Sequence, residues 1–354
     1  MKIGIVTLVG NYNYGNRLQN YAMTKLLESY GHEVDTLVFP RRPDISFHRL
    51  KYKVNCLLGR VQDPEKSISP ERLQRFKKFN ESLSFVSVHG DYGKLNDAYD
   101  AFVVGSDQVW NPEFINDYNA YFLRFAEPSK RIAVAASFGV SSIPDNVRDI
   151  YAECLGGFKS ISVREEAGVS LVRQLAGKED CCCVIDPTLA LSDTEWKRAA
   201  CNDLNPDKPY IFSYMLGGIT AEQENYLHVA CANNGMQLVL LSDRDNSSQL
   251  PAGPADFIGL IDGADQVITN SFHGAVISSI LKKSLQVMKK NGNDPTFSRL
   301  STLSAKLGLG FECNEGSIAF TAKYDRLDEK LKDEREALAC YLNQAGLTGK
   351  VQWL

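Results

Sequence analysis

The chain has 354 residues, of which 44% are hydrophobic and 23% are charged, an ordinary globular composition. Its length is enough for two domains with separate cores. The formal net charge of −4 gives no support to a nucleic-acid-binding protein, which normally has a basic surface.

Strands and helices alternate through the first half of the chain. Residues 2–7 predict a strand, residues 17–30 have the apolar spacing of a helix, and residues 33–39 predict a second strand. A helical crossover between two strands makes them parallel. Residues 41–95 are less regular and predict a helical insertion, in which the basic stretch at 72–78 is expected to be a solvated helix face. Later apolar runs predict buried central strands at 101–104, 131–136, 160–163 and 182–185.

A second series begins after a polar linker near residues 192–208. Strands are predicted at 210–214, 237–241, 256–258, 266–269 and 284–288, and a charged amphipathic helix at 324–345. The pattern predicts an α/β fold with two Rossmann-like domains, at residues 1–195 and 205–322. A C-terminal helix and tail at 324–354 would follow.

The start of the chain and its cysteines predict a cytoplasmic protein. The first apolar run is too short for a signal peptide, and no stretch approaches the ~20 apolar residues that cross a bilayer. The nine cysteines are odd in number, lack CxxC spacing and include three in a row at 181–183. Adjacent cysteines do not readily bond to one another without strain, so we expect reduced thiols.

The most informative stretch joins the predicted strand 266–269 to a helix of small residues. It contains Asn270 and Ser271, and His273 and Gly274 begin the helix. Backbone N–H groups at a helix start attract anions, and Gly274 would let a ligand approach them. An imidazole there suits acid–base chemistry on a phosphate-bearing substrate. The alternative is a helix start at which His273 only hydrogen-bonds the backbone.

Polar residues also gather where earlier strands end, which is where ligands bind in open α/β sheets. The loop at residues 10–17 contains Asn13, Asn16 and Arg17, but it matches no nucleotide-binding motif. It is either a ligand-binding loop or a plain turn in which Asn and Gly relieve positive φ angles.

Three polar residues follow the strand at 101–104, namely Ser106, Asp107 and Gln108. Asp107 stands where a general base or an acceptor for a sugar hydroxyl would lie. It could also cap the next helix, because Asp is a favoured N-cap. We expect Trp110 to pack in the core rather than to stack on a sugar.

Arg164 follows the strand at 160–163 and has the planar fork that binds carboxylate or phosphate. Its alternative partners are Glu165 and Glu166. The turn at 137–139 is small and polar, with room for a ligand. The residues at 186–188, Asp-Pro-Thr, either close the core or line the cleft.

Together these motifs resemble the polysaccharide pyruvyltransferase family. The stretches that carry the resemblance occur in a consistent order at residues 13–22, 104–110, 162–165, 186–188 and 270–274. It implies a glycosyltransferase-B-like pair of domains facing across a cleft, with the acceptor on the N-terminal side and the donor on the C-terminal side. It also implies an enzyme that transfers the enolpyruvyl carbon of phosphoenolpyruvate onto two saccharide hydroxyls, forming a pyruvate ketal in surface polysaccharide biosynthesis.

The resemblance implies no metal and no cofactor, since phosphoenolpyruvate is a donor substrate; the saccharide acceptor is free or lipid-linked. By the same resemblance His273 is the acid or the phosphate anchor, and Arg164 holds the carboxylate or phosphate. Asp107 is expected, from its position alone, to orient or deprotonate an acceptor hydroxyl. The substrate site is expected to include Asn13, Asn16, Arg17, Ser106, Gln108, Asn270, Ser271, Gly274 and Arg299.

One departure from the family pattern matters. Other branches carry an arginine two residues before the histidine, where this chain has Ser271. A lost charged hydrogen bond is worth about 1.5–3 kcal/mol. Either another cation substitutes, with Arg17 and Arg299 as candidates, or the donor differs. The competing hypotheses are a glycosyltransferase that uses a nucleotide sugar and a non-catalytic saccharide- or anion-binding protein.

Overall fold

The computed structural model describes residues 1–39, 68–89, 92–115, 117–242, 250–288, 295–310 and 318–348, without the side chains of 295–299 and 301. Most of the predicted insertion at 41–95 and the last six residues of the expected tail therefore lie outside the described part. Within the described ranges, no helix is long and apolar enough to cross a membrane.

The first sheet has seven parallel strands in the order β3-β2-β1-β4-β5-β6-β7. Its strands are β1 (Lys2–Val6), β2 (Glu33–Val38), β3 (Phe85–Ser87), β4 (Ala101–Val104), β5 (Arg131–Ala136), β6 (Ser160–Val163) and β7 (Cys182–Cys183). The helices between them are α1 (Tyr14–Ser29), α3 (Pro70–Asn80), α4 (Leu95–Ala98), α5 (Tyr118–Tyr121), α6 (Asp145–Gly156) and α7 (Glu166–Ala176). The strand order reverses between β1 and β4, so a crevice opens at their carboxyl ends.

The second sheet has five strands in the order β12-β11-β10-β8-β9, of which only β12 is antiparallel to its neighbour. Its strands are β8 (Tyr210–Met215), β9 (Gln237–Ser242), β10 (Gln266–Thr269), β11 (Ser284–Met288) and β12 (Ala319–Thr321). Its helices are α9 (Ala221–Asn234), α10 (Pro254–Gly263), α11 (Phe272–Ile280) and α12 (Pro295–Leu307). The order reverses between β8 and β10, so α11 begins at this second switch point.

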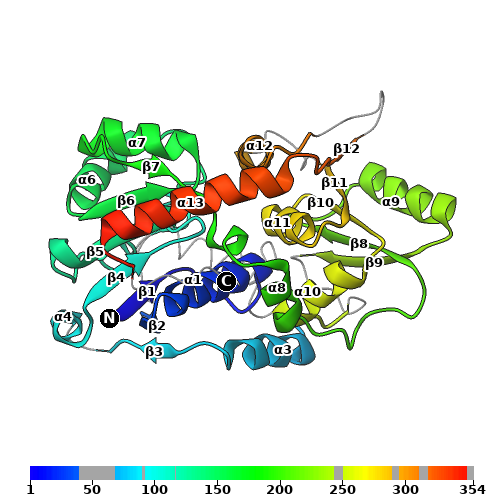
Figure 1. The fold of residues 1–354 in the computed structure, drawn as a ribbon, viewed down its shortest axis with the longest axis horizontal. Helices are drawn as coiled ribbons and strands as arrows, with labels where there is room; N and C mark the ends of the chain where they lie inside the picture. Colours follow the sequence, from blue (N-terminus) through cyan, green and yellow to red (C-terminus); the bar gives the residue numbers. More distant parts are fainter. Residues whose placement is uncertain are drawn as a thin grey trace, which may run out of the picture.

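Two short helices and one long one join the sheets. The 3-10 helix η3 (Pro187–Leu189) and α8 (Asp193–Ala199) carry the chain from β7 towards β8. The last helix, α13 (Leu327–Ala345), runs back from the second sheet across the first (Figure 1). Its Tyr341 hydroxyl donates to the carbonyl of Ala133 in β5, and Lys159 donates to the carbonyl of Ala345.

One hydrophobic core runs through both sheets. It contains residues of β1 and α1 from the first sheet, of β10 and α11 from the second, and of α13. Tyr14 lies at the centre of this contact: its ring stacks on Phe257 and its hydroxyl donates to the carbonyl of Ala252. The α/β fold with two Rossmann-like parallel sheets is therefore confirmed.

Three details differ from the sequence predictions. Residues 256–258 belong to α10 rather than to a strand, because Pro254 and the Asp256 side chain, which accepts from the Gly253 N–H, begin a helix there. Its buried apolar run resembles that of a strand. The predicted strand at 182–185 ends at Cys183. The expected helical insertion contains the helix α3, as predicted, but it also contains the strand β3.

The basic stretch at 72–78 is not a wholly solvated face. Arg72 and Phe76 are buried, and the Arg72 guanidinium lies over the ring of Tyr14. Arg75 forms an ion pair of 2.6 Å with Asp256 of α10. The stretch therefore packs against both sheets. Trp110, as predicted, is a core residue, and the described cysteines are free thiols.

Candidate active site between the two sheets

Asp186 is the centre of the site, although it stands at the start of a short helix and not at a predicted catalytic position. Its Oδ1 accepts from the N–H and the hydroxyl of Thr188, at 3.0 and 2.6 Å, and so caps η3. Its Oδ2 accepts from Ser106 Oγ and from Arg164 Nη1, both at 2.7 Å. The carboxylate is 1% exposed. It therefore joins the ends of β4, β6 and β7.

Arg164 pairs with this aspartate and not with the glutamates that follow it in sequence. Its guanidinium also lies 3.6 Å from Asp107 Oδ1 and packs over the ring of Phe272, 4.8 Å from the centroid. Burial opposes the charged form, but the surrounding carboxylates raise the pKa of Arg164 above its ordinary value. Its Nε and Nη2 have no hydrogen-bond partner in the described structure. The guanidinium is therefore fixed in position by Asp186, while two of its nitrogens form no hydrogen bond in the described structure.

His273 reaches the same centre from the second sheet. It is the second residue of α11 and is 7% exposed. Its Nε2 lies 3.8 Å from Asp186 Oδ2 and has no hydrogen-bond partner among the described residues. The ring rests on Gly15 of α1, where a Cβ atom would overlap it. Instead of hydrogen-bonding the backbone, His273 faces a buried carboxylate across the contact between the sheets.

The charge on Asp186 is strongly stabilised. Burial would raise its pKa, but the neighbouring His273 and Arg164 and the Thr188 hydroxyl lower the pKa well below its usual range. Asp186 is therefore ionised at neutral pH. This ionised carboxylate lies 3.8 Å from His273 Nε2.

Ser106 and Asp107 lie in the turn after β4, as the sequence predicts. The Ser106 N–H donates to Gln19 Oε1, whose amide in turn donates to the hydroxyl of Thr7. Asp107 has φ 64° and is 7% exposed. It caps no helix; its carboxylate accepts from the N–H of Gln108. The same carboxylate oxygen lies 3.6 Å from Arg164 Nη2.

The turn at 137–139 does not have the room that its small residues predict. Glu165 Oε1 accepts from the Ser137 hydroxyl and from the N–H groups of Phe138 and Gly139. Gln108 turns to the same place, where its side-chain oxygen accepts from Asn111. Side chains therefore occupy the space next to this turn.

Several predicted binding residues make structural contacts. Asn13 caps α1 by accepting from the N–H of Asn16, which is itself buried. Asn270 bonds to both backbone groups of Leu216 and so ties β10 to β8. Ser271 caps α11 by accepting from the N–H of Gly274. Gly274 is buried, and a Cβ atom there would lie 2.9 Å from Thr269 Oγ1.

Of the two proposed substitutes for the missing arginine, the structure describes the side chain of Arg17 only. Arg17 is fully buried, donates to the carbonyl of Leu8 and lies over the ring of Phe85. Burial without a carboxylate partner lowers its pKa to about 10. Arg299 belongs to α12, but its side chain lies outside the described part of the structure.

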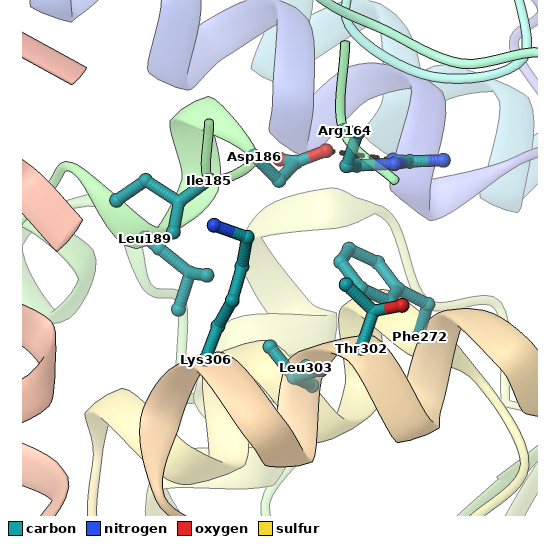
Figure 2. Close-up of a pocket in the computed structure, with 8 residues that line it drawn as sticks. All are labelled: Arg164, Ile185, Asp186, Leu189, Phe272, Thr302, Leu303 and Lys306. Atoms are coloured by element: carbon teal, nitrogen blue, oxygen red, sulfur yellow. Dashed lines mark hydrogen bonds and ion pairs between the residues drawn. The ribbon is translucent and has the colours of Figure 1, made fainter. Parts of the chain in front are cut away.

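A pocket opens beside the Arg164–Asp186 pair (Figure 2). Its other walls come from η3, α11 and α12, and it is lined by Arg164, Ile185, Asp186, Leu189, Phe272, Thr302, Leu303 and Lys306. In the described residues, no cluster of His, Cys, Asp and Glu is arranged to hold a metal ion.

The sequence left the role of Asp186 open, between closing the core and lining the cleft, and gave no prediction for Gln19 or Lys306. Asp186 had a signal, because a carboxylate directly after an apolar strand and before Pro-Thr is typical of a strand-end site. The sequence carries no such signal for Gln19 or Lys306, because each is an ordinary polar residue within a helical pattern.

Comparison with solved structures finds similar folds at low identity. UDP-GlcNAc 2-epimerase from Methanocaldococcus jannaschii has a TM-score of 0.48 and 13% identity, over 100% of this chain and 95% of that chain. A putative UDP-N-acetylglucosamine 2-epimerase from Listeria monocytogenes has a TM-score of 0.48 and 10% identity, over 98% and 90%. The heptosyltransferase WaaC of E. coli has a TM-score of 0.38 and 13% identity, over 86% and 98%.

No curated protein matches the chain in sequence. The family model described as polysaccharide pyruvyl transferase matches residues 13–284, which include Asp107, Arg164, Asp186 and His273. The match spans most of the chain and both sheets. The chain therefore belongs to the polysaccharide pyruvyl transferase family.

Proposed function

We propose that this protein transfers the pyruvyl group of phosphoenolpyruvate onto two hydroxyls of a saccharide in surface polysaccharide biosynthesis. One observation carries the proposal: Arg164 and His273, from opposite sheets, meet at the buried carboxylate of Asp186. A cation and an acid–base group thus share one carboxylate, and Arg164 and Asp186 also line a pocket. The family membership supports the choice of donor.

The reaction needs proton transfer at several atoms. A proton added to C3 of phosphoenolpyruvate leaves a cation at C2, to which the first sugar hydroxyl adds as it loses its proton. The C2–O bond to phosphate then breaks, and the second hydroxyl adds to C2 and loses its proton. Of the two hydroxyl protons, one balances the proton on C3 and the other leaves with phosphate.

The described residues can be assigned to these steps. In the proposal His273, whose Nε2 lies 3.8 Å from Asp186 Oδ2, delivers a proton to C3 or to the departing phosphate. Arg164 holds the donor carboxylate with its two unpartnered nitrogens. Asp107, whose Oδ1 lies 3.6 Å from Arg164 Nη2, accepts a proton from a sugar hydroxyl.

The test is phosphate release from phosphoenolpyruvate in the presence of surface saccharide acceptors, with His273→Gln as the variant. Loss of general acid catalysis should lower turnover by about 10²–10⁴-fold. Because glutamine nearly fills the same space, the thermal midpoint should stay within a few degrees of the wild-type value. Calorimetry with phosphoenolpyruvate and with a UDP-hexose accompanies the assay. Binding of the nucleotide sugar alone would overturn the proposal.

A further inference from the structure

The charges at the centre leave an excess of negative charge. One guanidinium, Arg164, faces two carboxylates, Asp107 and Asp186. Phosphoenolpyruvate brings a further carboxylate and a phosphate. A protonated His273 would only balance the protein's own charges. An anion of this kind therefore needs another cation in the same pocket.

Ser271 cannot supply that charge, and its hydroxyl already caps α11. Arg17 is bonded to the Leu8 carbonyl and packed on Phe85. Neither of them is among the residues that line the pocket.

Lys306 does line the pocket, on the wall opposite Arg164 and Asp186. Figure 2 shows its side chain extending from α12 towards the segment that holds Ile185 and Asp186. Its side chain is 17% exposed, and its Nζ lies 2.8 Å from Glu334 Oε2 of α13 and 3.4 Å from the carbonyl of Cys183. The ammonium group is therefore mostly shielded from solvent and has one carboxylate partner, Glu334. The long side chain of lysine allows it to move.

We propose that Lys306 is the second cation of the donor site and binds the phosphate of phosphoenolpyruvate. This inference rests on the proposed function. The planar fork of Arg164 suits the donor carboxylate, whereas the compact charge of Lys306 suits a phosphate oxygen. On binding, Lys306 turns from Glu334 to the ligand. Glu334 thereby competes with the donor for the same ammonium group.

The experiment measures the Kd of phosphoenolpyruvate by calorimetry for the full-length wild type and four variants. Lys306→Met removes the charge at similar volume and should weaken binding 10- to 100-fold. Lys306→Arg keeps the charge and should bind within a few-fold of wild type. Glu334→Gln removes the competitor and should bind as tightly as wild type or more tightly. Lys330→Met, at a partly exposed position of α13 beside Asp333, controls for the loss of one positive charge.

The opposite response of the two partners separates this role from a structural one. A structural ion pair would make Lys306→Met and Glu334→Gln weaken binding alike, with parallel losses of thermal stability, and this result would overturn the inference. So would unchanged binding in Lys306→Met when the wild type binds the donor. If the wild type itself does not bind phosphoenolpyruvate, the proposed function fails first and the inference fails with it.

Discussion

Asp186 is the residue on which the site depends. It is almost wholly buried, yet it stays ionised because its partners Ser106, Thr188 and Arg164 all donate to it. A buried carboxylate with so many donors holds its neighbours in place and stabilises their positive charge. Residues 106, 164 and 273 of the family motifs therefore meet at the carboxylate of Asp186 rather than by contact with one another.

Asp186→Asn should lower the free energy of unfolding by about 3 kcal/mol at neutral pH, because it leaves the buried Arg164 without its closest countercharge. The folded pKa of Asp186 is lowered, so its contribution is complete at neutral pH and declines as pH falls below the unfolded value of about 4. Urea denaturation at pH 7, 5 and 4 measures this difference, which should begin to shrink only at the lowest pH.

Asp193→Asn is the matched control, because Asp193 lies in the exposed first turn of α8. That variant should change the free energy of unfolding by only a few tenths of a kcal/mol, as is usual for exposed pairs. An equal, small effect of both substitutions would contradict the central role of Asp186.

At the scale of elements, the first turn of α1 packs against the first turn of α11. Gly15 makes this approach possible, because the His273 ring occupies the space of a Cβ atom. Asn13 and Ser271 begin these two helices with their side chains as caps. Residues that the sequence marks as ligand contacts therefore position the ends of the two helices.

Gly15→Ala should separate activity from stability. Alanine in place of glycine favours a helix by about 1 kcal/mol, but here the added methyl group displaces the imidazole. We expect a loss of turnover of at least 10-fold with a thermal midpoint within a few degrees of wild type, measured by phosphate release and thermal denaturation. Gly156→Ala in α6, where a Cβ atom meets nothing within 4 Å, should leave activity unchanged. Full activity of Gly15→Ala would show that the position of His273 is unimportant.

At the scale of the whole molecule, the two sheets share one continuous hydrophobic core. Their shared core includes six residues of α13 that are buried, among them Leu338, Tyr341 and Leu342. Arg335 adds hydrogen bonds from α13 to the carbonyls of Leu189 and Leu191. The helix that closes the chain thus ties the second sheet to the first.

Leu342→Ala should destabilise the protein by about 2–5 kcal/mol, the cost of a cavity at a fully buried leucine. Because the core is continuous, hydrogen-exchange protection should fall by the same free energy in β5 and in β10. Lys332→Ala, at an exposed position of α13, should leave both unchanged. Loss of protection in one sheet alone would show that the sheets unfold separately.

How much of the fold and the site can be predicted from the sequence depends on how far apart in sequence the interacting residues lie. Apolar runs such as residues 101–104 and 266–269 fall within the strands as predicted, because burial on both faces of a parallel strand leaves a local signal. The run at 256–258 was misassigned to a strand, since a fully buried helix leaves the same signal. The placement of His273 at a strand–helix junction followed from residues within ten positions of it.

The sequence by itself determined the alternation of strands and helices, the family motifs and their order, and the candidate roles of His273, Arg164 and Asp107. Only the tertiary structure decided which of these residues meet. Strand order brings residues 106, 164 and 186 to one sheet edge, and the packing of α11 on α1 adds His273. The same packing turns Arg17 away and brings Lys306 to the pocket. Local propensity and periodicity act over a few residues, whereas burial and countercharge depend on contacts between distant segments.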